Sequence, residues 1–477
     1  MRSATLVLFL ALYGCASSPG YRSSGIEIPQ SFRALGDSTH VAPYVAPENS
    51  ATHAAQTESP VVNVSYWEQL GDSTLTRLVE EVLRASPDVL AGRARVSAAN
   101  ADRVRAAPDL TPTASLYGDY TRQRLATASF PGATGTFPDQ NVWEAGVNAT
   151  WDLDLFGQIR RTAQAHGALV NVAEEDLRDV QVSAAAELAR AYFQLRGAQE
   201  ALAVAREAAD NQRRTFDLTR ERLAAGRGSA FDTERAQAQL SSTLATIPAR
   251  EALVAAEQYR IGTLVGRSPT DVALELDQPG RIPALPLLTA IESPELVVRR
   301  RPDVASAERY AAAQGAFVGA AKASYLPRIS IGGGAAYAAP DFNSLGEQGM
   351  GRYAVGPVVS WPINFGRVKA EVNAAEAREE VARETYRHTV LAAMQDLETT
   401  LVRYRTARER LDRLEEASAA SERAAKLARL RFGEGMTDLL QVLDAERTLL
   451  DAQDLLAQGR VDAATAYAAL YRAVGGR

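Results

Sequence analysis

Few residues of this chain have the types and spacing that could carry out chemistry. Asp152 and Asp154 lie on one face of an expected strand and could imitate a catalytic carboxylate pair. A similar segment later in the chain has Pro362 and Asn364 in their places, so we interpret the aspartates as lining a strand-to-helix junction. The four histidines are scattered, and no Walker loop, dinucleotide fingerprint or nucleophile elbow is present. We therefore predict a protein that is not an enzyme and binds no cofactor and no metal.

Cys15, the single cysteine, is expected to be modified. Arg2 and the apolar run 4–12 are typical of a signal peptide, residues 1–14, rather than of a membrane span. The Leu-x-Gly-Cys ending resembles a bacterial lipobox, whose cysteine becomes N-terminal and lipidated after cleavage. We predict a lipoprotein with acyl chains such as palmitate on Cys15. The alternative is a non-functional cysteine near an ordinary cleavage site.

The composition narrows the possible functions. The formal net charge is −6, and no basic block of the kind that binds nucleic acid is present. No run of 18 or more apolar residues appears, so we expect no helix to span a bilayer. Residues 15–62 are rich in Ser, Pro, Thr and Ala, which predicts an irregular tether.

Two long helical runs dominate the chain, and their starts are alike. Strong helix formers without proline follow Trp151-Asp-Leu-Asp-Leu-Phe-Gly157, and a second such run follows Trp361-Pro-Ile-Asn-Phe-Gly366. From the two Phe-Gly pairs onward a constant offset of 209 residues separates the halves, as between Gly157 and Gly366. We interpret this as an internal duplication.

Shorter helices complete each half. We expect long helices at 157–225 and 366–432, and shorter ones at 75–107, 229–266, 294–323 and 437–474, the first of these four with a local break at Ser86-Pro87. Two short helices placed end to end match each long one in length. Heptad spacing, as in Leu240, Ile247, Val254 and Ile261, predicts that the helices pack side by side. Each chain would then supply four rods to a cylinder of antiparallel helices.

Four segments alternate apolar and polar residues with a period of two: 111–123, 141–151, 329–337 and 353–361. About ten alternating residues with aromatic ends are typical of a transmembrane β-strand, although a half-buried soluble sheet gives the same alternation. The predicted membrane-interface aromatics are Trp143, Trp151, Tyr353 and Trp361. Four strands cannot close a barrel in lipid, so the chain must form a cyclic oligomer if they span a membrane. Three copies would supply twelve strands, but the pattern alone does not fix three.

The order and spacing of these motifs resemble the TolC-like outer-membrane efflux factors, in the lipoprotein branch that serves resistance–nodulation–division (RND) pumps. The resemblance covers nearly everything from Trp67 to Gly475. It rests on the duplicated layout, the two Phe-Gly segments, Arg431-Phe-Gly-Glu-Gly435 and Leu440-Gln-Val-Leu-Asp-Ala445. It implies a mainly α fold with a small β part. The fold would be a trimeric α-barrel of long antiparallel helices plus a twelve-stranded outer-membrane β-barrel, with four strands per chain.

The resemblance also divides the chain. We expect a signal peptide (1–14), a lipidated tether (15–62), a first outer-membrane efflux protein repeat (63–267), an equatorial linker (268–293) and a second repeat (294–477). Residues near 267–293 and the segment around Trp67 are the candidates for a mixed equatorial belt.

The resemblance places a periplasmic gate where the tips of the helix pairs meet. Its constriction falls at Leu440, Gln441 and Asp444. Three Asp444 carboxylates near one axis would repel one another and attract cations. The alternative is that Asp444 is a solvated charge on a helix.

Other tip residues receive supporting roles. Phe432 and Thr437 match positions that latch the tip. Asp232 and Arg235, the first-repeat counterparts of Gln441 and Asp444, are candidate latch residues through an Arg235–carboxylate contact. The predicted adaptor-contacting positions are the tip glycines Gly226, Gly228, Gly433 and Gly435.

Together these patterns predict a passive exit duct for drugs or other small toxic compounds, anchored in the bacterial outer membrane with a long periplasmic extension. The expected partners are two further copies of the chain, a periplasmic adaptor (membrane fusion) protein, an inner-membrane RND transporter and outer-membrane lipid. Two alternatives remain open: an exit duct for type I protein secretion, and a lipid-tethered coiled-coil scaffold without a pore.

Overall fold

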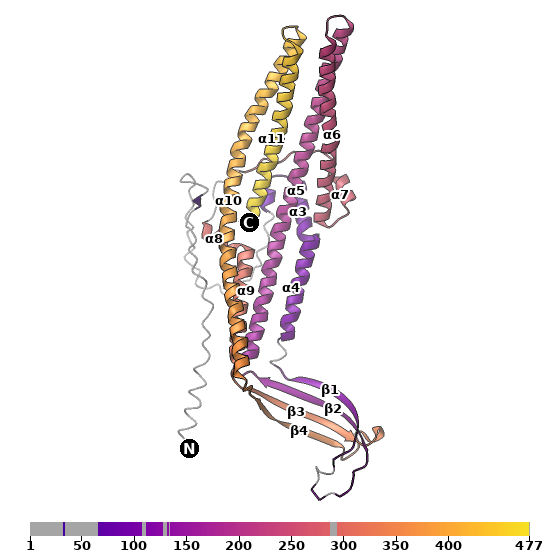
Figure 1. Cartoon of the computed structure of the whole chain (residues 1–477), viewed down its shortest axis with the longest axis vertical. Coiled ribbons are helices and arrows are strands. Elements are labelled where there is room, and N and C mark those ends of the chain that lie inside the picture. Colours follow the sequence, from indigo (N-terminus) through magenta and orange to yellow (C-terminus); the bar gives the residue numbers. More distant parts are fainter. Residues whose placement is uncertain are drawn as a thin grey trace. The chain divides into compact units, whose positions relative to one another are not determined.

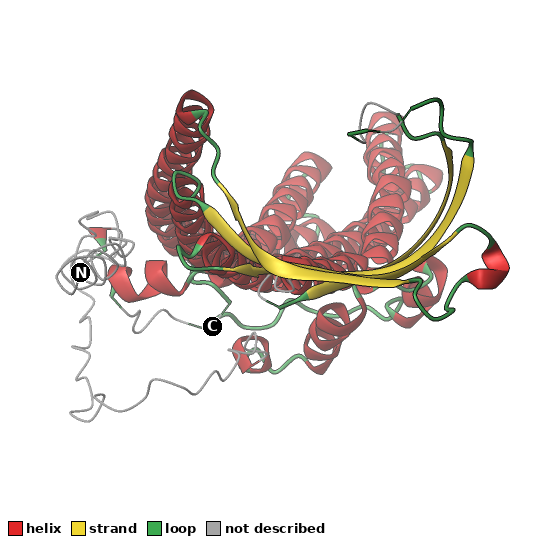
Figure 2. Cartoon of the chain, turned by 90° about the horizontal axis from the view of Figure 1, so that it is seen from below, coloured by secondary structure: helices red, strands yellow, loops and turns green. Residues whose placement is uncertain are grey.

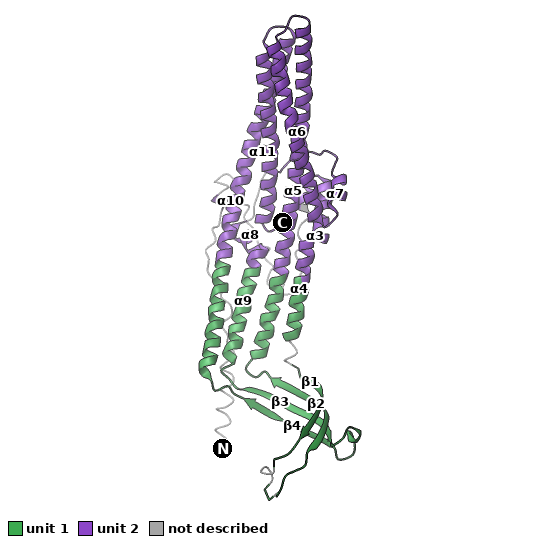
Figure 3. Ribbon diagram, turned by 45° about the vertical axis from the view of Figure 1, so that its right-hand side comes forward, with its two compact units in different colours: residues 1–25, 95–173, 306–387 green, residues 26–94, 174–305, 388–477 purple. Residues whose placement is uncertain are grey.

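The computed structural model describes residues 32–33, 65–106, 111–126, 131–132, 134–286 and 293–476. The signal peptide, Cys15 and nearly all of the tether lie outside the described residues. The described residues fall into two compact units (Figure 3), one within residues 95–173 and 306–387 and one within residues 32–94, 174–305 and 388–476.

The first unit contains one antiparallel sheet of four strands in the order β1-β2-β3-β4. The strands are β1 (Thr113–Gln123), β2 (Gln140–Leu153), β3 (Arg328–Ala339) and β4 (Gly351–Ser360), and the short 3₁₀ helix η4 (Phe342–Ser344) lies between β3 and β4. All four expected strands are present. The sheet is strongly curved (Figure 2), and in the single chain β1 and β4 are its two edges.

The helices follow the duplicated plan (Figure 1). They are α2 (Ser65–Glu68), α3 (Ser73–Ala85), α4 (Pro87–Ala106), α5 (Gln158–Ala224), α6 (Ala230–Val265), α7 (Pro269–Glu275), α8 (Pro294–Arg300), α9 (Pro302–Ala323), α10 (Phe365–Gly433) and α11 (Leu439–Ala473). Helix α5 has 67 residues and α10 has 69, so at 1.5 Å per residue each is about 100 Å long.

One expected helix is divided in the structure. The single helix predicted over 294–323 is two helices, because α8 ends at Arg300 and α9 starts at Pro302. Arg301 between them is extended, as expected for the residue before a proline. Arg301 also donates to the carbonyl of Ala473 at 3.0 Å and pairs with Asp396 at 3.0 Å.

The core of the second unit is aromatic and lies where the shorter helices meet α5, α10 and α11. Trp67 is fully buried, and its ring centroid lies 4.7 Å from that of Tyr471. Tyr66 stacks on Tyr467 at 4.6 Å. The stretch after α7 is held by side chains of the long helices: Arg196 donates to the carbonyl of Gln278, and Tyr404 to that of Pro286.

Candidate functional site

One face of the sheet carries the large apolar side chains. Trp143 and Trp151 are an even number of residues apart on β2, so their side chains point to the same face of the sheet. The strand pairing through β3 places Tyr353 of β4 on that face as well. Trp361 follows β4 directly and donates to the carbonyl of Tyr325 at 3.1 Å. Tyr353 is 84% exposed in the single chain. An apolar surface of this extent on a protein requires a partner surface or a lipid.

The opposite face of the sheet carries mainly polar and small side chains, with Val142 and Val358 as its larger apolar ones. The phenol of Tyr117 on β1 donates to the carboxylate of Glu144 on β2 at 2.5 Å. Arg352 on β4 forms an ion pair with the same carboxylate. Between them, β3 presents only alanine, glycine and serine along most of this face. The two faces therefore differ as the lipid and lumen faces of a membrane sheet differ.

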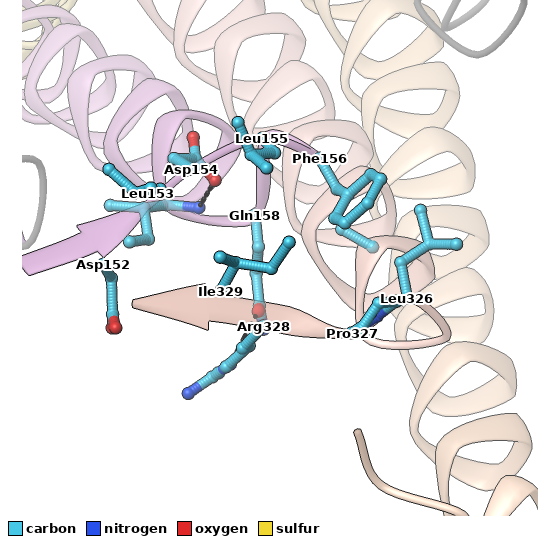
Figure 4. Close-up of a pocket in the computed structure, with 12 residues that line it drawn as sticks. Asp152, Leu153, Asp154, Leu155, Phe156, Gln158, Leu326, Pro327, Arg328 and Ile329 are labelled. Carbon is cyan, nitrogen blue, oxygen red and sulfur yellow. Dashed lines mark hydrogen bonds between the residues drawn. The ribbon is translucent and has the colours of Figure 1, made fainter. Parts of the chain in front are cut away.

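A small pocket lies where β2 gives way to α5 (Figure 4). Asp154 accepts from the backbone N–H groups of Ile159 and Arg160 at 3.0 and 2.9 Å, so it caps the start of α5. Asp152 also lines this pocket, and the two carboxylates point away from one another (Figure 4). The prediction that the aspartates line the strand-to-helix junction is confirmed. In the second repeat, Asn364 takes the capping role by accepting from the Arg367 N–H at 3.3 Å.

The far ends of the long helices form two tight turns, here called the first tip (residues 222–231) and the second tip (residues 431–440). Gly226 and Gly435 both have positive φ, 69° and 75°, which ends each long helix. The N–H after each glycine donates back to the carbonyl of Arg222 or Arg431 at 2.8 Å. The sequence prediction that glycines end the long helices is confirmed.

The other two tip glycines differ in what they require. A Cβ on Gly228 would lie 2.8 Å from the backbone nitrogen of Leu223, so this turn has no room for a side chain there. Gly433 is the last residue of α10, and a Cβ at this position would meet nothing within 4 Å.

The predicted constriction residues share one exposed stripe of α11. Leu440 is 51% exposed, and Gln441 and Asp444 are exposed beside it. The Thr437 hydroxyl donates to the Gln441 side-chain oxygen at 2.5 Å. Asp444 pairs only with its helix neighbour Arg447, at 3.3 Å, among the ion pairs of the described residues. The stripe is therefore available to face other copies of the chain.

The opposite side of α11 packs into a small apolar cluster made of Phe432, Leu439, Val442 and Leu443. Phe432 is 8% exposed, which suits its predicted role in holding the tip. The Arg222 guanidinium of the first tip lies 4.3 Å from the Phe432 ring centroid and donates to the Phe432 carbonyl at 3.1 Å. Arg222 was not among the predicted site residues, because in the sequence it looks like one of many surface arginines. The signal that could have found it is Arg431, which occupies the equivalent position in the duplication.

The two candidate latch residues of the first repeat are not brought together as a pair. The Arg235 guanidinium lies 5.5 Å from the Phe231 ring centroid, and no ion pair between Arg235 and Asp232 is found in the part of the chain that the structure describes. Both side chains are half-buried. The Arg235–carboxylate contact stays a prediction that only an assembled oligomer can test.

A buried carboxylate on α11 was also not among the predicted site residues. Glu446 is 5% exposed, and Arg429 of α10 lies 3.5 Å from its Oε1. The Thr215 hydroxyl of α5 is 3.4 Å from the same oxygen. Burial raises the pKa of the Glu446 carboxyl, while Arg429 opposes this shift. The cluster joins three long helices through a charge that is only partly compensated.

Two further observations bound the chemistry of the described residues. They include no group of three or more His, Cys, Asp or Glu side chains that could hold a metal ion. They also include no helix long and apolar enough to cross a membrane.

Comparison with known proteins identifies the family. The family described as "Outer membrane efflux protein" matches residues 78–267 and 294–476, which is most of the chain and both halves of the duplication. The chain belongs to the outer membrane efflux protein family. This bears out the resemblance seen in the sequence motifs.

Individual relatives align with this efflux protein over nearly its whole length. It is 28% identical over 478 residues to the probable efflux pump outer membrane protein TtgC of Pseudomonas putida, covering 98% of this chain and 93% of TtgC. It is 26% identical to the probable outer membrane lipoprotein SilC of Salmonella typhimurium, covering 93% and 92%. Among solved structures, the outer-membrane channel OprN superposes with a TM-score of 0.83 at 34% identity, covering 97% of this chain and 99% of OprN. The fold of long helices with a four-stranded sheet is therefore that of the family's channels.

Proposed function

We propose that this efflux protein is the outer-membrane channel subunit of a tripartite efflux system, a passive exit duct for drugs or other small toxic compounds. The observation that carries the proposal is the sheet with one aromatic, exposed face and one polar face, joined to two helices of about 100 Å each. Its family membership and full-length match to an outer-membrane channel support the same function.

The single chain cannot close such a duct. Strands β1 and β4 are sheet edges with unpaired backbone groups, and lipid tolerates no open edge. Edge β1 of one copy and edge β4 of the next would complete the ladder by cyclic symmetry. Three copies give twelve strands, and the homotrimer is part of our proposal.

The duct is tested by reconstituting the purified protein in planar bilayers and measuring its oligomeric state and conductance. We expect trimers that form discrete ion channels. Val355→Asp changes the apolar face, and Leu155→Asp, outside the strands, is its control. If the trimer keeps its current with Leu155→Asp but loses it with Val355→Asp, the apolar face lies in lipid. A monomer or elongated dimer without conductance would instead favour a scaffold.

The periplasmic gate is proposed at the exposed stripe of Leu440, Gln441 and Asp444. Three copies of Leu440 and Asp444 near one axis would narrow the duct there, and the three carboxylates would concentrate cations. We expect Asp444→Ala or Leu440→Ala to raise channel conductance or antibiotic leakage into cells. Asp451→Ala, an exposed carboxylate on the same helix two turns away, is the control. Unchanged conductance in both gate variants would remove these residues from the constriction.

The tips are the proposed contact with a periplasmic adaptor, which would link the duct to an inner-membrane RND transporter. Their charges differ: the first tip carries Arg222 and Arg227, while the second carries Glu434 and Asp438 besides Arg431. We expect a bulky substitution at the exposed Gly433 to weaken capture of the adaptor without lowering conductance of the isolated channel. A loss of both would mean that the tip itself had misfolded.

Cys15 is the proposed site of lipidation, supported by the lipobox-like sequence and by the similarity to a lipoprotein, SilC. Acyl chains would hold the N-terminus in the outer membrane beside the barrel. Metabolic labelling with radioactive palmitate should mark the wild-type chain and not Cys15→Ser. Labelling that persists in this variant would reject the assignment.

A further inference from the structure

The polar face of the sheet contains an acidic pair that strand pairing alone would disfavour. Asp119 on β1 and Glu144 on β2 are register partners, directly opposite one another. Like charges in this position repel, because their side chains leave the sheet side by side. Asp119 accepts from the Thr121 hydroxyl at 2.7 Å but forms no ion pair among the described residues. A compensating cation is needed elsewhere.

That cation comes from two strands away. Arg352 on β4 is the register partner of Ala336 on β3, and Glu144 is the partner of Ala338. The Arg352 side chain therefore crosses β3 diagonally to reach Glu144. Because residues 336 and 338 are alanines, no bulky side chain on β3 blocks the path of the arginine side chain across the strand. The alanines on this strand face are thus part of the ion pair's geometry.

The two carboxylates end in different states. Glu144 is held by Arg352 and by the Tyr117 hydroxyl, and its side chain is 17% exposed. Arg352 remains 64% exposed, so its charge still faces the open side of the sheet. Each chain then presents Asp119 as its one uncompensated charge in this cluster.

The cluster lies at the end of the sheet opposite the long helices. Asp119, Glu144 and Arg352 lie closer to the β1–β2 and β3–β4 connections than to the opposite ends of their strands, and Tyr117 lies near the middle of β1, whereas α5 and α10 follow the other ends of β2 and β4. In the proposed duct this end is the outer mouth. We propose that Arg352 is a selectivity residue there, which neutralises one of the two carboxylates of this cluster and so keeps the mouth passable for anionic as well as neutral compounds.

This inference rests on the proposed function, because only a closed barrel turns the polar face into a lumen. Three copies without Arg352 would present a ring of six carboxylates at one level. Such rings select cations in channels and repel anions. With Arg352 in place, three carboxylates are neutralised and three remain.

The first experiment asks whether the polar face is the lumen. Asn148 and Val147 are neighbours on β2 that point to opposite faces, and both are exposed in the single chain. On intact cells, membrane-impermeant methanethiosulfonate reagents should label Asn148→Cys and not Val147→Cys, with the wild-type chain as the blank for Cys15. If Asn148→Cys stays unlabelled, the proposed function fails, whatever Arg352 does.

The second experiment measures charge at the mouth through the ratio of labelling rates of Asn148→Cys by a cationic and an anionic reagent. Access from outside makes this readout independent of the periplasmic gate. We expect Arg352→Gln to raise the cation-to-anion ratio about threefold or more at low salt, where the Debye length is about 30 Å. Glu144→Gln should lower the ratio, and the double variant should return it toward the wild-type value.

Arg122→Gln is the matched control, since Arg122 lies on β1 near the same end but follows the parity of the apolar face and pairs with Asp139. The cation-to-anion ratio of labelling rates in Arg122→Gln should stay at the wild-type value. The proposal is overturned if Asn148→Cys is labelled but Arg352→Gln and Glu144→Gln leave the ratio unchanged. It is also overturned if Arg122→Gln shifts the ratio as much as Arg352→Gln. Should Arg352→Gln not assemble, Glu144→Gln and the double variant still decide the outcome.

Discussion

The first and second tips are equivalent by duplication, yet only the second contains a cluster of buried apolar side chains. Both turn on a glycine of positive φ, with the same hydrogen bonds back to an arginine carbonyl. At the offset of 209, Phe432 and Leu439 of the second tip correspond to Leu223 and Ala230 of the first. Phe432 is buried, whereas Leu223 is 37% exposed.

The difference shows that backbone geometry and side-chain packing were retained separately after duplication. The glycines preserve the turn in both repeats, because few other residues adopt this conformation without strain. The apolar cluster is found only in the second tip, and the first tip contacts it through the side chain of Arg222. We therefore expect the second tip to be the more stable, with the first depending on it.

Removing the buried ring should have the largest effect. Phe432→Ala removes the largest side chain of the apolar cluster and the surface on which Arg222 lies, at a cost of about 3 kcal/mol. Amide hydrogen exchange should then accelerate about 100-fold in both tips. The equivalent Leu223→Ala removes a partly exposed side chain and should accelerate exchange less than about tenfold. Similar effects of the two substitutions would remove the asymmetry between the tips.

Removing the contact between Arg222 and Phe432 should have the next largest effect on tip stability. Its cation–π and hydrogen-bond contributions together amount to about 2 kcal/mol. Arg222→Ala should therefore loosen the first tip and leave the cluster around Leu443 protected, as seen by hydrogen exchange. Arg431, its counterpart, is exposed, and Arg431→Ala serves as the control. Equal loosening of both tips by Arg222→Ala would contradict a one-sided dependence.

Sequence patterns predicted the elements well and the contacts between them poorly. Periodicity and glycine placement located all four strands and both tips, because these features depend on neighbouring residues. Arg222 and Phe432 are 210 residues apart, so nothing local announces their contact. The break at Arg301 was missed, although Pro302 beside it carried the signal.

Glu446 was missed for a related reason. It is charged and corresponds to the polar Gln237 of the first repeat, so its residue type indicated a surface position, although its spacing from Val442 and Leu449 places it on their face of the helix. Only the placement of α5 and α10 against α11 buries it. The aspartates at 152 and 154 show the reverse case, since comparing the two repeats was enough to assign them to the junction.

The tip glycines should behave alike despite the different packing. A Cβ on Gly226 or Gly435 would meet nothing within 4 Å, so Gly226→Ala and Gly435→Ala test the backbone alone. Each should cost about 1 kcal/mol through the left-handed conformation. Differential scanning calorimetry of the two variants should give equal downward shifts in Tm. A larger shift for Gly435→Ala would mean that the apolar cluster also constrains the second turn.

The smallest effect should appear as a pH dependence that comes from Glu446, whose first-repeat counterpart Gln237 carries no charge. Burial raises the pKa of Glu446, so the folded state binds its proton more readily than the unfolded state does. Stability at this site therefore rises as pH falls from the raised folded pKa toward the ordinary value of about 4.3, and is lost again as pH increases.

Glu446→Gln removes this titration and should stabilise the protein at neutral pH by less than about 1 kcal/mol, because it replaces a poorly compensated buried charge with a neutral amide. Gln237→Glu places the same carboxyl at the equivalent exposed position, where it should add no pH dependence. The measurement is the Tm of each variant between pH 4.5 and pH 8, relative to wild type. If Glu446→Gln follows the wild-type curve at every pH, the buried carboxylate is already fully compensated by Arg429 and Thr215. The two repeats would then not differ in charge compensation at this position.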